Sequence, residues 1–304
     1  MFTGWIIRRY VRGKPLTRSS AASLQGAVSV VLNILLAAFK VVLAMRLHSL
    51  ALWADAAHTA SDLVTSLSIV AGFRAATLPP DRNHPHGHGR LEDMVTLFVS
   101  LALVWSALGL ARAGWLRAQA PVAENAAGWM LLVLAGMAAV KEWMARLALH
   151  LGKKVDAPAL VADAWHHRVD GLAGAAVVVG LLLSNLGYRG VDAFLAMGIA
   201  ALVARTGAML CIGAVSRLLG EKPPEHVVET IAHAALAVDG VDHAHGVRVH
   251  HYGSRRVVSL NIHVAPQLSV RRSHDIATQV EHGIGDSLPG SEVVVHVEPG
   301  TPTA

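Results

Sequence analysis

The nine residues ADAAHTASD at 54–62 recur as ADAWHHRVD at 162–170, and this repeat, set in apolar sequence, decides the fold. Both copies share the pattern A-D-A-x-H-x-x-x-D. An α-helix turns by about 100° per residue, so the Asp, His and Asp at positions i, i+3 and i+7 fall on one narrow face. Each copy is therefore predicted to present an imidazole and a carboxylate one turn apart, and two such faces can converge on one cation.

The apolar runs that hold the repeat belong to a series of six. Each is long enough to cross a bilayer, which takes roughly 20 apolar residues. They lie near residues 24–46, 49–77, 91–115, 126–148, 158–184 and 190–216. With 53% hydrophobic and only 15% charged residues, the chain is predicted to be an α-helical membrane protein. Six transmembrane helices are expected within residues 24–217.

Basic residues indicate the orientation of these helices. The stretch up to Arg18 is basic, and no small-residue cleavage site follows its first apolar part, so residues 1–23 are interpreted as a cytoplasmic tail rather than a removable signal peptide. The basic connections near residues 82–90 and 153–154 fall on the same side as this tail. Both termini are therefore expected in the cytoplasm. The formal charge of +5 follows from this topology and calls for no nucleic-acid partner.

A soluble domain is predicted at residues 218–304. It begins at the breaker-rich linker Gly220–Pro224, and no later run is both long and apolar enough to span. The pattern indicates a helix at 225–238, strands at 246–251 and 256–264, a helix at 270–288 and a strand at 292–297. This αββαβ order is typical of a small ferredoxin-like α/β sandwich. Its modest core favours association with a second copy, and residues 299–304 are expected to be a loose tail.

The histidines and second aspartates of the repeat are predicted to form a metal site within the membrane. The single cysteine leaves His and carboxylates as ligands, and His58, Asp62, His166 and Asp170 suit a tetrahedral ion of the zinc type. The alternative is that they form interhelical hydrogen bonds or lie near helix ends. Each Asp in mid-membrane costs about 2.5–3.5 kcal/mol on insertion scales, and a bound dication compensates that cost. The metal site is therefore preferred.

The first aspartates of the repeat, Asp55 and Asp163, have two interpretations. They either accept hydrogen bonds that orient the His rings or pack the helices together. The residue pattern does not choose between these roles.

A second candidate metal site lies in the loop after the second predicted helix. Residues 81–92 read DRNHPHGHGRLE, with three His at alternate positions and a nearby Asp, broken by Pro and Gly. Such a loop can fold around a cation, but more weakly than the intramembrane site, because binding must order it. The other interpretation is a solvated polar loop without metal.

The soluble domain contains a third group of histidines. His296 and Glu298 share one strand face, and His263 neighbours them if its strand pairs alongside. Taken singly, each histidine of this domain is equally explained as a surface or core residue.

The ordered motifs resemble the cation diffusion facilitator family of bacterial zinc and iron efflux transporters. The likeness spans nearly the whole chain and rests on four stretches: His48-Ser49, residues 81–92 matching H-P-x-G-H-G-x-x-E, ADAWHHRVD at 162–170, and VVVHVEP at 293–299. It implies a homodimer with six membrane helices and a cytoplasmic αββαβ domain.

The resemblance also implies three groups of metal-binding residues. The transport site would be His58, Asp62, His166 and Asp170. The loop site would be Asp81, His84 and His88. The cytoplasmic-domain site would be His245, His263, His274, His296 and Glu298. Some members have Asp where this chain has His58, and the His-Asp/His-Asp set resembles the zinc-preferring version.

The predicted function is export of zinc or a similar divalent ion, such as Cd, Co or Fe, across a bacterial inner membrane in exchange for protons. Protons compete with the metal because imidazoles must be neutral and carboxylates ionised to bind it. Transport is not an enzyme reaction, and no cofactor is expected. The alternative is a membrane-anchored metal sensor or assembly scaffold. An intramembrane metalloprotease is disfavoured because the sequence lacks an H-E-x-x-H helix.

Overall fold

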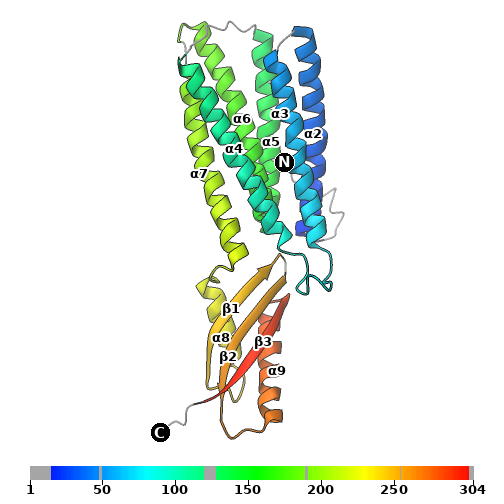
Figure 1. Ribbon diagram of the computed structural model, residues 1–304, viewed down its shortest axis with the longest axis vertical. Coiled ribbons are helices and arrows are strands. Elements are labelled where there is room, and N and C mark those ends of the chain that lie inside the picture. Colours follow the sequence, from blue (N-terminus) through cyan, green and yellow to red (C-terminus); the bar gives the residue numbers. More distant parts are fainter. Residues whose placement is uncertain (1–14, 48–49, 120–127, 189–190, 254, 301–304) are drawn as a thin grey trace. The chain divides into compact units, whose positions relative to one another are not determined.

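The computed structural model describes residues 15–47, 50–119, 128–188, 191–253 and 255–300 (Figure 1). The basic stretch up to Lys14, the pair His48-Ser49 and residues 301–304, which the sequence interpretation used, lie outside this description. The described residues form two compact units. One contains the residues up to Thr77 together with Leu91–Val215, and the other contains Leu78–Arg90 together with the residues from Ser216 onward.

The first unit is built from long helices that run side by side (Figure 1). They are α2 (Arg18–Leu47), α3 (Leu50–Ala76), α4 (Leu91–Gln119), α5 (Gly128–Lys154), α6 (Pro158–Asn185) and α7 (Val191–Leu219). Each helix matches one of the six predicted apolar runs, although some ends differ by up to six residues. Within the described residues, four of them, α2, α4, α6 and α7, are long and apolar enough to cross a membrane. The other two, α3 and α5, are not among these four. Both carry charged residues within their length, such as Asp62 in α3 and Lys141 in α5.

Helix α2 begins at Arg18 and not near residue 24, so the predicted tail extended too far into the helix. The backbone N–H of Thr17 donates to Ser20 Oγ at 2.9 Å, and the N–H of Ser20 donates to Thr17 Oγ1 at 3.2 Å. This reciprocal pair works like a capping box and satisfies N–H groups at the helix start. A search for apolar runs does not detect a polar first helical turn of this kind.

The two helices that hold the repeat each pack along a neighbour, α3 along α2 and α6 along α5. Glycine permits the close approach of α6 to α5. A Cβ atom at Gly171 would lie 3.2 Å from the carbonyl oxygen of Ala138, and one at Gly174 would lie 3.4 Å from the Cβ of Ala138. Small residues at such contacts let membrane helices approach closely. Side chains of α5 can therefore reach the face of α6 that holds the repeat.

The second unit contains a three-stranded sheet with two helices packed on it (Figure 1). The elements are α8 (Glu225–Leu236), β1 (His243–Tyr252), β2 (Arg255–Val264), α9 (Val270–Ser287) and β3 (Ser291–Pro299). Strand β2 lies in the middle, antiparallel to β1 and parallel to β3. A helical membrane unit followed by a small α/β domain of αββαβ order is therefore confirmed.

The sheet of the second unit has two different faces. Leu260 and Ile262 of β2 are buried in a core with Ile276 and Val280 of α9. Successive side chains of a strand point to opposite faces, so the polar residues that alternate with Leu260 and Ile262 lie on the face away from the helices. His263 is one of them.

The last strand extends beyond its predicted end. Pro299 is the final residue of β3 and pairs in register with Val264. The N–H of Gly300 then donates to the carbonyl oxygen of Val264 at 2.7 Å. The expected loose tail from residue 299 is wrong for these two residues, because strand pairing continues past the apolar run that marked the strand.

Candidate metal sites

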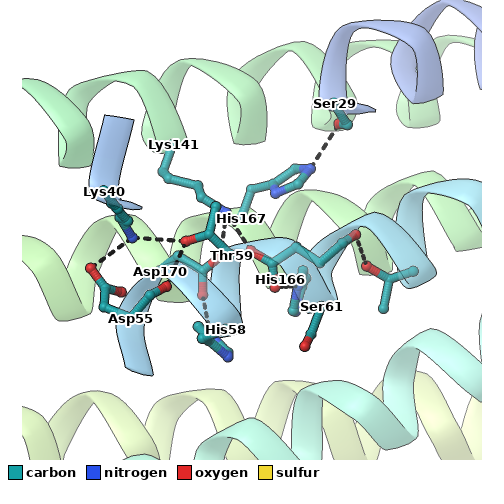
Figure 2. A network of polar contacts seen from close by, with 12 residues as sticks. Ser29, Lys40, Asp55, His58, Thr59, Ser61, Lys141, His166, His167 and Asp170 are labelled. Atoms are coloured by element: carbon teal, nitrogen blue, oxygen red, sulfur yellow. Dashed lines mark hydrogen bonds and ion pairs between the residues drawn. The ribbon is translucent and has the colours of Figure 1, made fainter. Parts of the chain in front are cut away.

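The four residues predicted from the repeat lie together between α3 and α6, and Figure 2 labels three of them, His58, His166 and Asp170. The ligand atoms of His58, Asp62 and Asp170 lie within 4.8 Å of one another. His166 Nε2 is 3.1 Å from Asp62 Oδ1, and His58 Nε2 is 3.6 Å from Asp170 Oδ1. Each carboxylate is thus paired with an imidazole from the other helix, so both helices contribute to one cluster.

The members of this cluster differ in burial. The side chains of Asp62 and His166 are only 2% and 4% exposed, whereas that of His58 is 52% exposed. Burying a carboxylate costs free energy unless it is paired and hydrogen-bonded. The cluster therefore has a deep end at Asp62 and an accessible edge at His58.

A lysine that the sequence analysis missed lies between the two carboxylates. Lys141 Nζ is 2.6 Å from Asp62 Oδ2 and 2.8 Å from Asp170 Oδ2 (Figure 2). The side chain comes from the middle of α5 and is 6% exposed. A lysine inside the predicted apolar run 126–148 was the available signal, because an intramembrane charge needs a partner.

Asp55 lies beside the cluster and pairs with a second buried lysine. Lys40 Nζ of α2 is 2.8 Å from Asp55 Oδ2 and donates to Thr59 Oγ1 at 2.8 Å (Figure 2). These contacts tie α3 to α2. Of the two interpretations of Asp55, the geometry favours helix packing.

Asp163 belongs to a buried polar group between α6 and α2. Gln25 Nε2 donates to Asp163 Oδ2 at 3.0 Å, and His167 Nε2 is 3.5 Å from Asp163 Oδ1 and 2.9 Å from Ser29 Oγ. The adjacent histidines of the repeat therefore diverge, His167 towards α2 and His166 towards Asp62 of α3. Helix packing is the better interpretation of Asp163 as well.

The loop between α3 and α4 folds around Asp81. His84 Nδ1 is 3.2 Å from Asp81 Oδ1, and His88 Nε2 is 3.5 Å from Asp81 Oδ2. The backbone N–H groups of His84 and Asn83 donate to Asp81 Oδ1 at 2.7 and 2.9 Å, and they lower the pKa of this carboxyl group. The three predicted loop residues thus gather around an ionised carboxylate, and their ligand atoms lie within 4.8 Å of one another.

The same loop packs on Tyr252 at the end of β1, within the second unit. The ring of His86 lies 5.1 Å from the Tyr252 ring, and the guanidinium of Arg90 lies 4.5 Å from it. A Cβ atom at Gly89 would collide with the backbone carbonyl of Tyr252, so only glycine fits there. The middle histidine of the loop therefore contacts an aromatic ring, while the outer two surround Asp81.

A third cluster crosses the sheet on the face away from α9. The parallel pairing of β2 with β3 places His263 opposite Glu298. Glu298 Oε2 is 3.1 Å from His263 Nε2 and 3.3 Å from His245 Nε2, and the two imidazole nitrogens are 3.1 Å apart. Partial burial acts to raise the pKa of Glu298, but the hydrogen bonds and charges of His245 and His263 outweigh it and lower the pKa. Asn261 Nδ2 holds the other carboxylate oxygen at 2.8 Å.

The two remaining predicted residues of this domain lie at different distances from the cluster. His296 Nε2 is 3.9 Å from Glu298 Oε1, at the exposed rim. His274 lies on α9, which covers the opposite face of the sheet from His263. The structure therefore does not bring His274 together with the other histidines within one chain.

Carboxylates and imidazoles clustered between membrane helices, with a second set on an attached α/β domain, define a class of metal-handling membrane proteins. Residues 27–219 match the cation efflux transmembrane domain, and residues 223–300 match the cation efflux protein cytoplasmic domain. The chain therefore belongs to the cation efflux, or cation diffusion facilitator, family, and the resemblance seen in its motifs is confirmed.

Several relatives are similar along most of this chain. The uncharacterized transporter MJ0449 of Methanocaldococcus jannaschii is 34% identical over 272 residues, which cover 89% of this chain and 96% of that protein. Metal tolerance protein C1 of Arabidopsis thaliana is 29% identical over 83% of this chain and 57% of its own length. The cation-efflux pump FieF of Yersinia pestis is 28% identical over 78% of this chain and 79% of its own length.

Solved structures are also similar to part of the chain. Two MamM CTD structures, a nickel form and a cadmium form, are 25% and 26% identical, each with a TM-score of 0.25. They cover 26% and 25% of this chain and 100% and 98% of their own chains.

Membership in the family supports transport of divalent metal cations by an integral membrane protein and the pairing of two copies. The activity is transport and not an enzymatic reaction.

Proposed function

We propose that this protein exports zinc from the cytoplasm in exchange for protons. The observation that carries the proposal is the convergence of one His and one Asp from α3 with one His and one Asp from α6. Two imidazoles and two carboxylates suit a tetrahedral ion of the zinc type better than an all-oxygen set would. The proposed ligands are His58, Asp62, His166 and Asp170. Other borderline ions, such as Cd, Co and Fe, compete through the same chemistry.

The proposal includes six membrane crossings in residues 24–217. The shortest of the helices α2–α7 has 27 residues, and a rise of about 1.5 Å per residue makes such a helix longer than the roughly 30 Å hydrocarbon core. The charged residues in the middle of α3 and α5 include Asp62 and Lys141, and Lys141 pairs inside the bundle with Asp62 and with Asp170 of α6. A charge satisfied in this way does not have to face lipid.

Residues 218–304 would form a cytoplasmic metal-binding and dimerisation domain, with both termini in the cytoplasm of a bacterial cell. The cluster of His245, His263 and Glu298 supports metal binding there, with His296 near enough to join after a small movement. The group of Asp81, His84 and His88 is the proposed loop site.

Proton exchange follows from the ligand chemistry. A metal ion binds neutral imidazole and ionised carboxylate, so protons arriving from a more acidic outer side compete with it for the same atoms. His58 and His166 are the proposed proton carriers. Alternating exposure of the α3 and α6 faces would then couple zinc leaving the cell to protons entering it.

The test is zinc uptake into proteoliposomes with an acidic lumen, followed by zinc-sensitive and pH-sensitive dyes. Asp62→Asn and Asp170→Asn should each abolish zinc uptake and the accompanying rise in luminal pH. Ser61→Ala is the matched control, because Ser61 precedes Asp62 but donates only within its own helix, to the Ala57 carbonyl at 3.0 Å. This variant should transport at the wild-type rate.

Two outcomes would contradict the proposal. Wild-type uptake by either Asn variant would remove the carboxylates from the site. Zinc binding without uptake by the wild-type protein would support a membrane-anchored sensor instead.

A further inference from the structure

Lys141 occupies the position where the proposed function requires a divalent ion. Its Nζ contacts the Oδ2 atoms of Asp62 and Asp170 at 2.6 and 2.8 Å. Each carboxylate keeps its Oδ1 atom beside an imidazole, at 3.1 Å from His166 for Asp62 and 3.6 Å from His58 for Asp170. The ammonium group therefore contacts both proposed carboxylate ligands through their Oδ2 atoms, which are not the atoms beside the histidines.

Charge makes the ammonium group and a metal ion competitors. One ammonium beside two carboxylates leaves the empty site with a single formal negative charge. A dication added next to the ammonium group would make the net charge of the site positive. Lys141 and Asp62 are almost fully buried there. Like charges repel strongly where water does not screen them. Simultaneous binding is therefore unfavourable, and the flexible four-carbon stem of lysine lets its head move away.

We propose that Lys141 is a tethered competitor for the transported ion. Its ammonium group fills the carboxylate pair when the site is empty, a divalent cation displaces it, and it returns as the ion leaves. This inference rests on the proposed function, because it takes Asp62 and Asp170 as the metal ligands.

A tethered competitor has two consequences for transport. A monovalent ion carries no more charge than the ammonium group, which is held at high effective concentration by its helix, so it cannot displace Lys141. A divalent ion can, which makes the site selective for charge. The returning ammonium also stabilises the empty site, so it lowers metal affinity and speeds release of the ion.

A purely structural role predicts the opposite effect on affinity. If Lys141 only held α3, α5 and α6 together, its removal would misplace the ligands and weaken zinc binding. If it competes with zinc, its removal leaves two unpaired carboxylates and strengthens binding. The sign of the change in zinc affinity therefore separates the two roles.

The experiment measures the zinc dissociation constant of full-length protein in lipid nanodiscs, by competition with a fluorescent chelator. All samples carry His84→Ala, His88→Ala, His245→Ala and His263→Ala, so that the loop and sheet clusters do not contribute. Lys141→Met should lower the dissociation constant on the order of tenfold or more. Lys141→Arg keeps the charge and should not bind zinc more tightly than the parent protein. In transport assays without the four background changes, Lys141→Met should lower both KM and the maximal rate.

The matched control is Lys40→Met, which removes a second buried lysine of the described helices, the partner of Asp55. Its zinc affinity should stay at the parent value. If Lys141→Met is too unstable to purify without metal, its melting temperature is compared with and without zinc, and zinc should raise it by more than in the parent protein. An affinity of Lys141→Met equal to or weaker than the parent, or a smaller zinc-induced rise in melting temperature, would overturn the inference.

A further variant separates failure of this inference from failure of the proposed function. Asp62→Asn combined with Asp170→Asn in the same background should lose zinc binding. If that variant still binds zinc like its parent, the ligand assignment itself is wrong, whatever Lys141→Met shows.

Discussion

His58 is the ligand of the proposed transport site on which ion choice most depends. Its side chain is 52% exposed at the edge of the cluster, so another ligand fits there without repacking a core. His58→Asp replaces a borderline nitrogen with an oxygen, and we expect the preference for zinc to relax towards harder or larger ions such as Cd, Fe or Mn. Competition uptake of zinc against each of these ions measures the change.

The control for this substitution is His167→Gln. His167 also belongs to the repeat, but it contacts Ser29 of α2 and not the clustered carboxylates. It should keep the wild-type order of preference. An unchanged order in His58→Asp would place His58 outside the group that binds the ion.

At the scale of residues, the sequence predicted those site residues that recur at regular helical spacing. Asp62, His58 and their counterparts repeat at helical spacing, so one face could be assigned without a structure. Lys141 has no such pattern, because its partners come from two other helices and the pairing depends on how α5 packs against α6. The second copy of the repeat has two adjacent histidines, and its alignment with the first copy selected His166, which the structure places beside Asp62.

At the scale of elements, the contact between α5 and α6 places Lys141 next to Asp170. Gly171 is tightly packed there, since a Cβ atom would be 3.2 Å from the Ala138 carbonyl oxygen and 3.3 Å from Glu142 N. Gly171→Val should force the two helices apart and destabilise the protein by about 1–3 kcal/mol, the usual cost of overpacking. We expect a lower melting temperature in detergent and slower zinc uptake.

Gly136→Val is the control for this prediction, because a Cβ atom at Gly136 of α5 would meet no atom of a neighbouring helix within 4 Å. This variant introduces the same valine side chain into α5. It should change neither the melting temperature nor the rate of zinc uptake. Equal behaviour of the two variants would show that close approach of α5 to α6 is not needed.

The helices and strands themselves were largely predictable from the sequence. An apolar run long enough to span a bilayer and the alternating pattern of a strand are both clear in the sequence. Their ends were not. Helix α2 starts earlier through the polar pair Thr17 and Ser20, and β3 runs on to Pro299 through pairing with Val264. In both places hydrogen bonds, rather than hydrophobicity, set the boundary.

At the scale of the whole molecule, the sequence predicted the order of the two units. It did not predict which segments of the chain belong to each unit. Leu78–Arg90 is compact with the second unit, although it lies between two helices of the first. The contacts of His86 and Arg90 with Tyr252 are long-range aromatic contacts, which a linear pattern cannot show.

The part of the second unit from α8 to β3 has a hydrophobic core of its own, so its candidate metal site can be tested apart from the membrane unit. We expect zinc to raise the melting temperature of residues 216–304 expressed alone at pH 7.5. Zinc at a hundred times its dissociation constant stabilises a folded form that alone binds it by about 2.7 kcal/mol. Calorimetry measures the shift, and His274→Ala should keep it, because His274 lies on α9 across the sheet from the cluster. His245→Ala combined with His263→Ala should abolish it.

The same shift should fade as the pH falls, because protons compete with the metal ion for the imidazole nitrogens. Glu298 does not cause this loss. Its lowered pKa means that it contributes stability above its ordinary value of 4.5 and loses that contribution only at lower pH. Between pH 7.5 and 5.5 this carboxylate stays ionised, so a decline over that range is not caused by Glu298. A zinc-induced shift that persists unchanged at pH 5.5, or that survives the double His→Ala change, would show that zinc binds this unit elsewhere.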